Sequence, residues 1–222
     1  MLRHFAALFA LCILGASPVG AVTVLSENFD GVLDGRIGGV ESTESVGGFA
    51  GKGGFDGSFL RNTSDGSPTT AKLTGLAPHS RLTISFDLAV IDTWDGPNAG
   101  RWGPDFFNIT LDEKRIYQAS FKHRGGSTVL TGSGDSMTRN TLSGSSIFGN
   151  RWNESGWKVA IDVAHTAPAA DLAFFASGAG WQGGNDESWA IDNLNIAAVP
   201  LPASLPLLVM GLAGLGIFRR RR

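Results

Sequence analysis

Apolar and polar residues alternate along residues 82–90, and this pattern constrains the fold of the chain more than any other feature. A period of two places alternate side chains on the same face of a β-strand, as half-buried strands require. No stretch shows a 3.6-residue apolar period with helix caps, so we predict an all-β domain. The apolar face of this strand consists of Leu82, Ile84, Phe86, Leu88 and Val90.

Other segments repeat the alternation between turn-forming residues. Residues 106–111 and 115–121 predict two strands joined by a hairpin turn at residues 112–114. The 31 glycines supply further turns. About ten short strands in one domain favour an antiparallel β-sandwich of the jelly-roll type. The remaining predicted strands lie near 22–29, 57–61, 70–75, 127–131, 156–163, 170–177 and 188–196.

Charge is distributed unevenly along the chain. Of the 18 basic residues, Arg3 and the four from Arg219 to Arg222 lie near the ends, whereas all 20 acidic residues lie between Glu27 and Asp192. The central region is therefore acidic. Binding to a phosphate backbone requires clustered Lys and Arg, so we predict no nucleic-acid partner.

Residues 1–21 have the composition of a signal peptide. A basic start at Arg3 precedes an apolar run, and small residues end the segment at Ala21. The alternative is a buried N-terminal helix. The single cysteine, Cys12, lies in this segment, so the central domain lacks disulfides and depends on its core for stability.

Residues 199–222 combine a proline-containing motif, an apolar stretch predicted to be helical, and a basic terminus. From Val199 to Phe218 the segment is barely long enough, at about 30 Å, to cross a bilayer as a helix. The four terminal arginines favour the cytoplasmic side for this end. The motif itself consists of Val199, Pro200, Leu201, Pro202 and Ala203.

This end of the chain resembles the PEP-CTERM sorting signals of Gram-negative bacteria, in their VPLPA variant. The resemblance implies transient anchoring in the inner membrane and processing by an exosortase-type enzyme. Release to the cell surface or the extracellular matrix would follow. A plain transmembrane anchor is the alternative. The resemblance says nothing about the central domain.

Residues 22–198 remain as the predicted β-sandwich domain. Its first strand carries Glu27, Phe29 and Asp30, and its last strand carries the sequence Ile191-Asp192-Asn193. These two ends resemble those of concanavalin/MAM-like and carbohydrate-binding jelly rolls. The resemblance implies that the first and last strands lie side by side.

Acidic residues in glycine-rich loops predict a structural calcium ion. Calcium takes six to eight oxygen ligands with flexible geometry, and one loop carries Asp92, Asp95 and Asp105. Asp192 is predicted to point inward, where a metal or Arg81 would compensate its charge. Residues 185–187 form a second acidic loop. The alternative is that these residues cap turns and accept backbone N–H groups.

Three of the six tryptophans lie in loops rich in Gly, Asp and Asn, namely Trp94, Trp102 and Trp181. An exposed indole there could stack on the apolar face of a sugar ring. The alternative is that these side chains cover the ends of the sandwich.

The sequence predicts a non-catalytic protein that binds carbohydrate or matrix at the cell surface. Zinc-ligand spacings and nucleophile-elbow motifs are absent from it. Two alternatives remain: a passive structural or adhesive surface protein, and a polysaccharide-active hydrolase or lyase with a pair of acidic residues.

Overall fold

The computed structural model describes residues 20–39, 42–45, 52–122, 126–131, 136–145, 154–184 and 186–201. Residues Ala21–Pro200 form one compact unit. The predicted signal peptide and the predicted apolar helix of the tail fall outside the described residues. Within the described part of the chain, no helix is long and apolar enough to cross a membrane.

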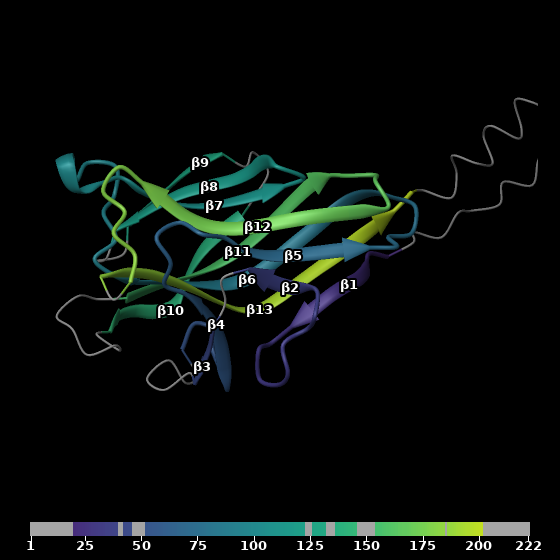
Figure 1. The fold of residues 1–222 in the computed structure, drawn as a ribbon, viewed down its shortest axis with the longest axis horizontal. Helices are drawn as coiled ribbons and strands as arrows, with labels where there is room; N and C mark the ends of the chain where they lie inside the picture. Colours follow the sequence, from purple (N-terminus) through teal and green to yellow (C-terminus); the bar gives the residue numbers. More distant parts are fainter. Residues whose placement is uncertain are drawn as a thin grey trace, which may run out of the picture. The chain divides into compact units, whose positions relative to one another are not determined.

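The described strands form two antiparallel sheets, which confirms the predicted β-sandwich (Figure 1). The first sheet has the order β10 (Ser136–Ser145), β11 (Glu154–Ala164), β6 (His79–Asp92), β13 (Glu187–Pro200), β4 (Ser58–Asn62) and β3 (Ser42–Ser45), with β1 (Val22–Glu27) also paired to β13. The second has the order β2 (Ile37–Gly39), β5 (Thr69–Thr74), β12 (Ala169–Gly178), β7 (Asp105–Leu111), β8 (Lys114–Lys122) and β9 (Gly126–Thr131).

The main core lies between the two sheets. Phe86 of β6 contacts Phe107 of β7 and Phe174 of β12, with ring centroids 6.0 and 5.9 Å apart. Trp189 of β13 packs edge-on against Phe107 at 5.1 Å. The five alternating apolar residues of β6 are all buried, as the sequence pattern predicts.

The predicted hairpin between β7 and β8 is confirmed. Leu111 pairs with Lys114, so the loop has two residues. Asp112 and Glu113 have φ angles of 49° and 66°, which is the left-handed conformation that tight hairpin turns need at both central positions.

The sequence does not predict three of the strands. β2 contains two glycines in three residues, and β3 is Ser-Thr-Glu-Ser. β10 is rich in Ser and Thr with isolated apolar residues. None of the three carries an alternating apolar face, so the local sequence pattern does not identify them, although Ile37 of β2 is buried in the main core.

The strands β6 and β13 run side by side through the whole length of the sandwich. At one end Asp92 pairs with Glu187, and at the other His79 pairs with Pro200. Each strand has 14 residues, so the two ends lie about 45 Å apart. We call the first the loop end and the second the terminal end.

The terminal end brings the two chain ends of the domain together (Figure 1). Val22 pairs with Ala198, so the first and last strands lie side by side, as the resemblance implied. β13 continues through Val199 and Pro200, and the first two residues of the predicted sorting motif therefore belong to the sheet.

Candidate functional site

Two crossover loops lie side by side at the loop end. One links β6 to β7 and the other links β12 to β13, so both pass from one sheet to the other. The Thr93 N–H donates to the carbonyl oxygen of Asp186 at 3.1 Å. A Cβ added to Gly180 would collide with the carbonyl oxygen of Trp102. Only glycine permits this close approach between the two loops.

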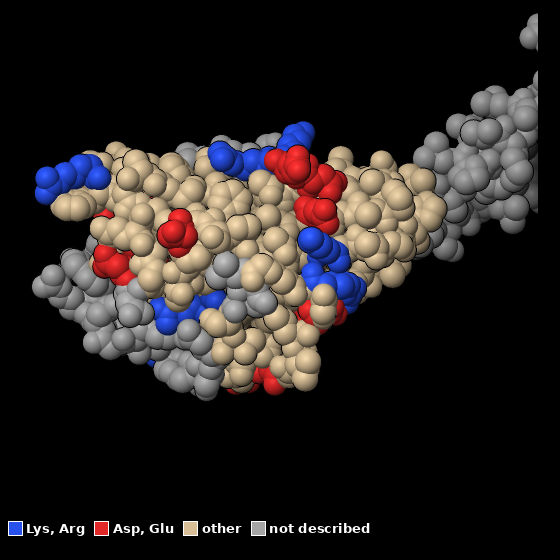
Figure 2. All heavy atoms as spheres, viewed as in Figure 1, with Lys and Arg blue, Asp and Glu red and all other residues tan. Residues whose placement is uncertain are grey.

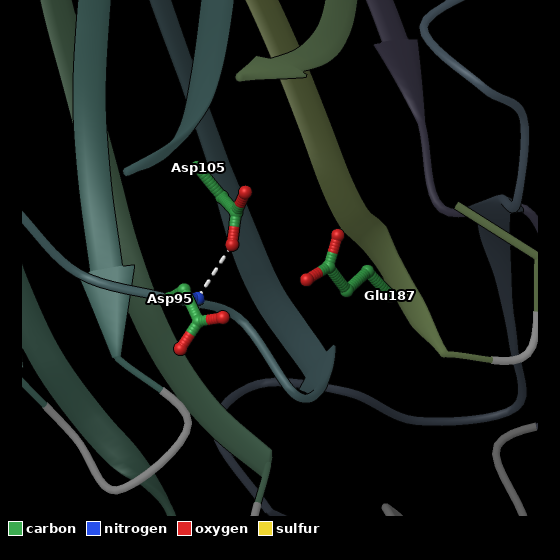
Figure 3. A group of neighbouring side chains, drawn as sticks. All are labelled: Asp95, Asp105 and Glu187. Carbon is green, nitrogen blue, oxygen red and sulfur yellow. Dashed lines mark hydrogen bonds between the residues drawn. The ribbon is translucent and has the colours of Figure 1, made fainter. Parts of the chain in front are cut away.

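Three carboxylates converge between these loops (Figure 3). Asp95 comes from the β6–β7 loop, Asp105 begins β7, and Glu187 begins β13. One carboxylate oxygen from each lies within 4.8 Å of the others. Asp105 and Glu187 are buried. The sequence predicts Asp95 and Asp105 as ligands, but the third member comes from the second acidic loop.

Backbone N–H groups hold part of this cluster in place. The Asp95 N–H donates to Oδ2 of Asp105 at 2.5 Å, and the Gln182 N–H donates to Oε2 of Glu187 at 2.8 Å. Oδ1 of Asp105 is buried and accepts no hydrogen bond from any described residue. This oxygen lies against β12, because a Cβ built on Gly178 would be 3.0 Å from it.

Burial disfavours the charged forms of these carboxylates. It raises the pKa of Glu187 to about 8, against the lowering effect of the Gln182 N–H, and the charges of Asp105, Asp186 and Asp95 raise it further. Burial likewise raises the pKa of Asp105 to about 6, with the N–H of Asp95 acting in the opposite direction. Without a cation the cluster thus retains a proton near neutral pH.

Asp92 is not part of this cluster, although the sequence prediction includes it. It ends β6 and is 2% exposed. Burial, followed by the charge of Glu154, raises its pKa to about 6, and the positive charge of Arg61 lowers it. The charge of Arg61 compensates these effects only in part, because the pKa of Asp92 remains raised.

Asp192 is buried, as predicted, but lies in a different part of the molecule. Its carboxylate accepts the N–H groups of Asp56 at 3.2 Å and Asn193 at 2.6 Å, which is the turn-capping alternative. Burial raises its pKa to about 6. The suggested partner Arg81 instead forms an ion pair with Asp162 at 2.5 Å.

The three loop tryptophans have different environments. Trp94 is 0% exposed and donates its Nε1–H to the carbonyl oxygen of Ser188 at 2.7 Å, so it cannot contact a sugar from solvent. Trp181 is half-buried, lies edge-on against Trp94 at 4.9 Å and donates its Nε1–H to Ser64. Trp94 and Trp181 therefore mainly cover the end of the sandwich, which is the alternative to sugar binding.

Trp102 is the loop tryptophan that faces solvent. It is 52% exposed and closes the 3-10 helix η2 (Gly100–Trp102), the short helical turn at the left tip in Figure 1. The guanidinium carbon of Arg101 lies 4.3 Å from the centre of the ring. The guanidinium therefore lies over one face of the indole, so a sugar ring could stack only on the other face, with Arg101 near enough to bind its hydroxyls or carboxylates.

Charge over the visible face is mixed. Figure 2 shows basic side chains at the tip where η2 lies and small groups of both signs elsewhere. No broad basic surface appears on this face, in keeping with the acidic balance of the central region.

Comparison with known proteins identifies no family. No protein-family model matches the sequence, and no curated protein matches it. The solved structures with some likeness include a CBM35 from Cellvibrio japonicus Abf62, at 12% identity and a TM-score of 0.33, covering 80% of this chain and 86% of that one.

Two larger structures show a similar degree of likeness. An exo-beta-1,3-galactanase from Phanerochaete chrysosporium has 10% identity and a TM-score of 0.34, covering 72% of this chain and 27% of that one. The Agl-KA catalytic domain has 13% identity and a TM-score of 0.35, covering 86% and 30%. This chain spans less than a third of either. Scores this low carry no inference about a ligand, so the proposals below depend on the residues of this chain.

Proposed function

We propose that this chain is an exported bacterial surface or matrix protein whose β-sandwich binds extracellular carbohydrate at the loop end. The observation that carries the proposal is the exposed ring of Trp102 beside Arg101. An exposed indole can stack on the apolar face of a sugar ring. The backbone of Trp102 packs closely against Gly180, and Trp94 of the same loop is buried.

Trp102 and the end of β13 lie at opposite ends of the sandwich. β13 leaves the sandwich at the terminal end and leads directly into the predicted sorting motif. The loop end lies about 45 Å away along the strands.

Binding is favoured over catalysis by the burial of the acidic residues. Asp105 and Glu187 are 0% and 1% exposed, so neither can reach a glycosidic bond held at the surface. A hydrolase needs its two carboxylates on either side of the bond that it cleaves.

A passive structural or adhesive role is the second candidate. Two of the three predicted contact residues favour it. Trp94 is fully buried, and Trp181 packs edge-on against Trp94. Under this alternative, Trp102 would have no glycan partner.

Replacing Trp102 tests the binding proposal. We expect Trp102→Ala to weaken binding to exopolysaccharide from the producing bacterium about tenfold or more, because it removes the exposed stacking surface. Isothermal titration or affinity electrophoresis measures the effect. Val32→Ala is the matched control, since Val32 is 98% exposed and lies in the loop between β1 and β2. Equal binding by both variants would favour the structural role.

The predicted tail processing is tested by mass spectrometry of protein from the producing cells. We expect the mature chain to end near Ala203, because exosortase-type processing acts near the motif and β13 is complete at Pro200. Such a cut would leave the sheet unchanged. An intact terminus at Arg219–Arg222 would contradict the sorting signal and indicate a simple membrane tether.

A further inference from the structure

We propose that the glycan bound at the loop end is an acidic polysaccharide, and that Arg101 selects it. In this arrangement one sugar stacks on Trp102, and Arg101 binds a carboxylate of the next sugar along the chain. The inference rests on the proposed function, because it names the kind of glycan that the same loop binds. Arg101 and Trp102 are consecutive residues of η2, and both are exposed.

The guanidinium of Arg101 keeps its hydrogen-bond donors for a partner outside the domain. It lies over the indole of Trp102, 4.3 Å from the centre of the ring. A cation–π contact of this kind uses the charge of the guanidinium rather than its N–H donors. The Arg101 side chain has no hydrogen bond or ion pair with any of the described residues. Its N–H groups lie in one plane, and a carboxylate fits them with two parallel hydrogen bonds.

Three other arginines of the domain are occupied by partners within the chain. Arg36 and Arg81 each form an ion pair with an aspartate, at 2.5 Å in both cases. Buried Arg61 donates to the hydroxyl oxygen of Ser188 at 2.9 and 3.1 Å. Arg101 differs from these three, because the acid that would pair with it is missing from the described part of the chain. An acidic ligand supplies that partner.

The position of Arg101 determines which sugar it reaches. Because the guanidinium covers one face of the indole, a sugar ring stacks on the other face. The guanidinium and this sugar then lie on opposite sides of the indole. Arg101 therefore reaches past the edge of the ring to the next sugar of the chain. A polysaccharide that carries carboxylates along its length makes both contacts at once.

A second cation lies against the same loop. A Cβ added to Gly96 would collide with the side chain of Lys122, so the stem of this exposed lysine crosses the loop at the glycine. The carbonyl oxygen of Gly96 accepts the N–H of Ala99 at 3.0 Å, in the turn that leads into η2. Figure 2 shows basic side chains projecting at the tip where η2 lies. Two exposed cations at one loop attract a polyanion to this end of the domain.

Acidic side chains of the neighbouring segments are engaged elsewhere. Asp95, in the same loop as Trp102, is turned toward Asp105 and Glu187 (Figure 3). The carboxylate of Asp186 accepts the hydroxyl of Thr93 at 3.2 Å. The guanidinium of Arg101 is therefore open to a carboxylate from the ligand.

Carboxyl reduction of the polysaccharide provides a direct test, because it converts each carboxylate to an alcohol and leaves the sugar chain in place. Isothermal titration of the full chain in detergent compares exopolysaccharide from the producing bacterium with its carboxyl-reduced form. We expect the native form to bind at least about tenfold more tightly, since the reduced form cannot make charge-assisted hydrogen bonds to Arg101. Added salt should weaken binding of the native form more than binding of the reduced form.

Variants assign this preference to Arg101. Arg101→Gln should remove most of it, by lowering the affinity for the native form about tenfold. Arg101→Lys keeps the charge without the planar donors, so its affinity for the native form should be intermediate. Trp102→Ala should weaken binding of both forms. Arg115→Gln is the matched control, because Arg115 is exposed on β8 and pairs with Thr110, at the far end of β7 from η2.

The outcomes separate this inference from the proposed function. Equal binding of the native and reduced forms by the wild-type protein would overturn the acidic preference and leave the carbohydrate proposal intact. A preference for the native form that Arg101→Gln retains in full would place the carboxylate at another group and overturn the role of Arg101. Binding to neither form would contradict the proposed function, and the inference with it.

Discussion

At pH 9, we expect Glu187→Gln to be more stable than the wild-type protein by up to about 5 kcal/mol, since the pKa of Glu187 is raised from 4.5 to about 8. The wild-type carboxylate must be charged at this pH, although it is buried and faces Asp105 and Asp95. A neutral amide of nearly the same shape avoids both costs.

The pH dependence of this effect follows from the raised pKa. Burial raises the pKa of Glu187 from 4.5 to about 8 in the folded protein. The folded state therefore binds the proton more tightly than the unfolded chain. The resulting stability is fully present below pH 4.5 and is lost as the pH rises through 8, with a slope of up to about 1.4 kcal/mol per pH unit.

Urea unfolding in EDTA between pH 5 and 9 measures this slope. The wild-type protein should lose stability across the range, and Glu187→Gln should follow a flatter curve. Asp162→Asn should follow the wild type, because Asp162 lies at the surface beside Arg81. Parallel curves for wild type and Glu187→Gln would show that Glu187 is already compensated by some other group.

Trp189→Ala should destabilise the domain by about 3 to 5 kcal/mol. Trp189 is 1% exposed on β13, and its ring packs against Phe107 of the opposite sheet at 5.1 Å. Truncation would leave a cavity between the two sheets, close to the start of β13. Because the central domain has no cysteine, no disulfide limits the entropy of its unfolded chain.

The midpoint of chemical denaturation gives this loss directly, at unchanged m-value. For a domain of this size the melting temperature should fall by roughly 10 °C or more. Trp102→Ala is the matched control, since it removes the same side chain from a position 52% exposed. It should change stability by less than about 0.5 kcal/mol. A loss below about 1 kcal/mol for Trp189→Ala would contradict the packing between the sheets.

The regular parts of the fold follow from local sequence patterns. Alternating apolar residues specify β6, and the turn residues Asp112 and Glu113 specify the following hairpin. β10 could not be predicted in the same way, because its Ser- and Thr-rich sequence shows no apolar face. Its pairing depends on β11, which lies later in the chain.

The candidate site could be predicted only in part, because its members come from distant segments. Asp95 and Asp105 lie close together in sequence and were expected to share a loop. Glu187 joins them because the β12–β13 loop crosses the same end of the sandwich, and no local pattern encodes that crossing. The acidic loop at residues 185–187 is the one sequence signal for its participation.

The composition of the loop does not predict that Trp94 is buried. Its neighbours are Thr93 and Asp95, which are typical of a surface turn. In the folded protein its ring turns inward, contacts Phe121 at 5.7 Å and is fully buried. A hydrogen bond to the carbonyl oxygen of Ser188 satisfies its only polar atom. Long-range packing therefore decides which tryptophan of this loop meets solvent.

The most direct test of the loop-end binding site is hydroxyl-radical footprinting of the full chain with and without exopolysaccharide from the producing bacterium. Trp102 is the exposed tryptophan among the described residues, and its oxidation is readily followed by mass spectrometry. We predict that saturating polysaccharide protects Trp102 and Arg101 while Val32 reacts as before. Saturable binding that leaves the oxidation of Trp102 unchanged would place the ligand elsewhere and contradict the account.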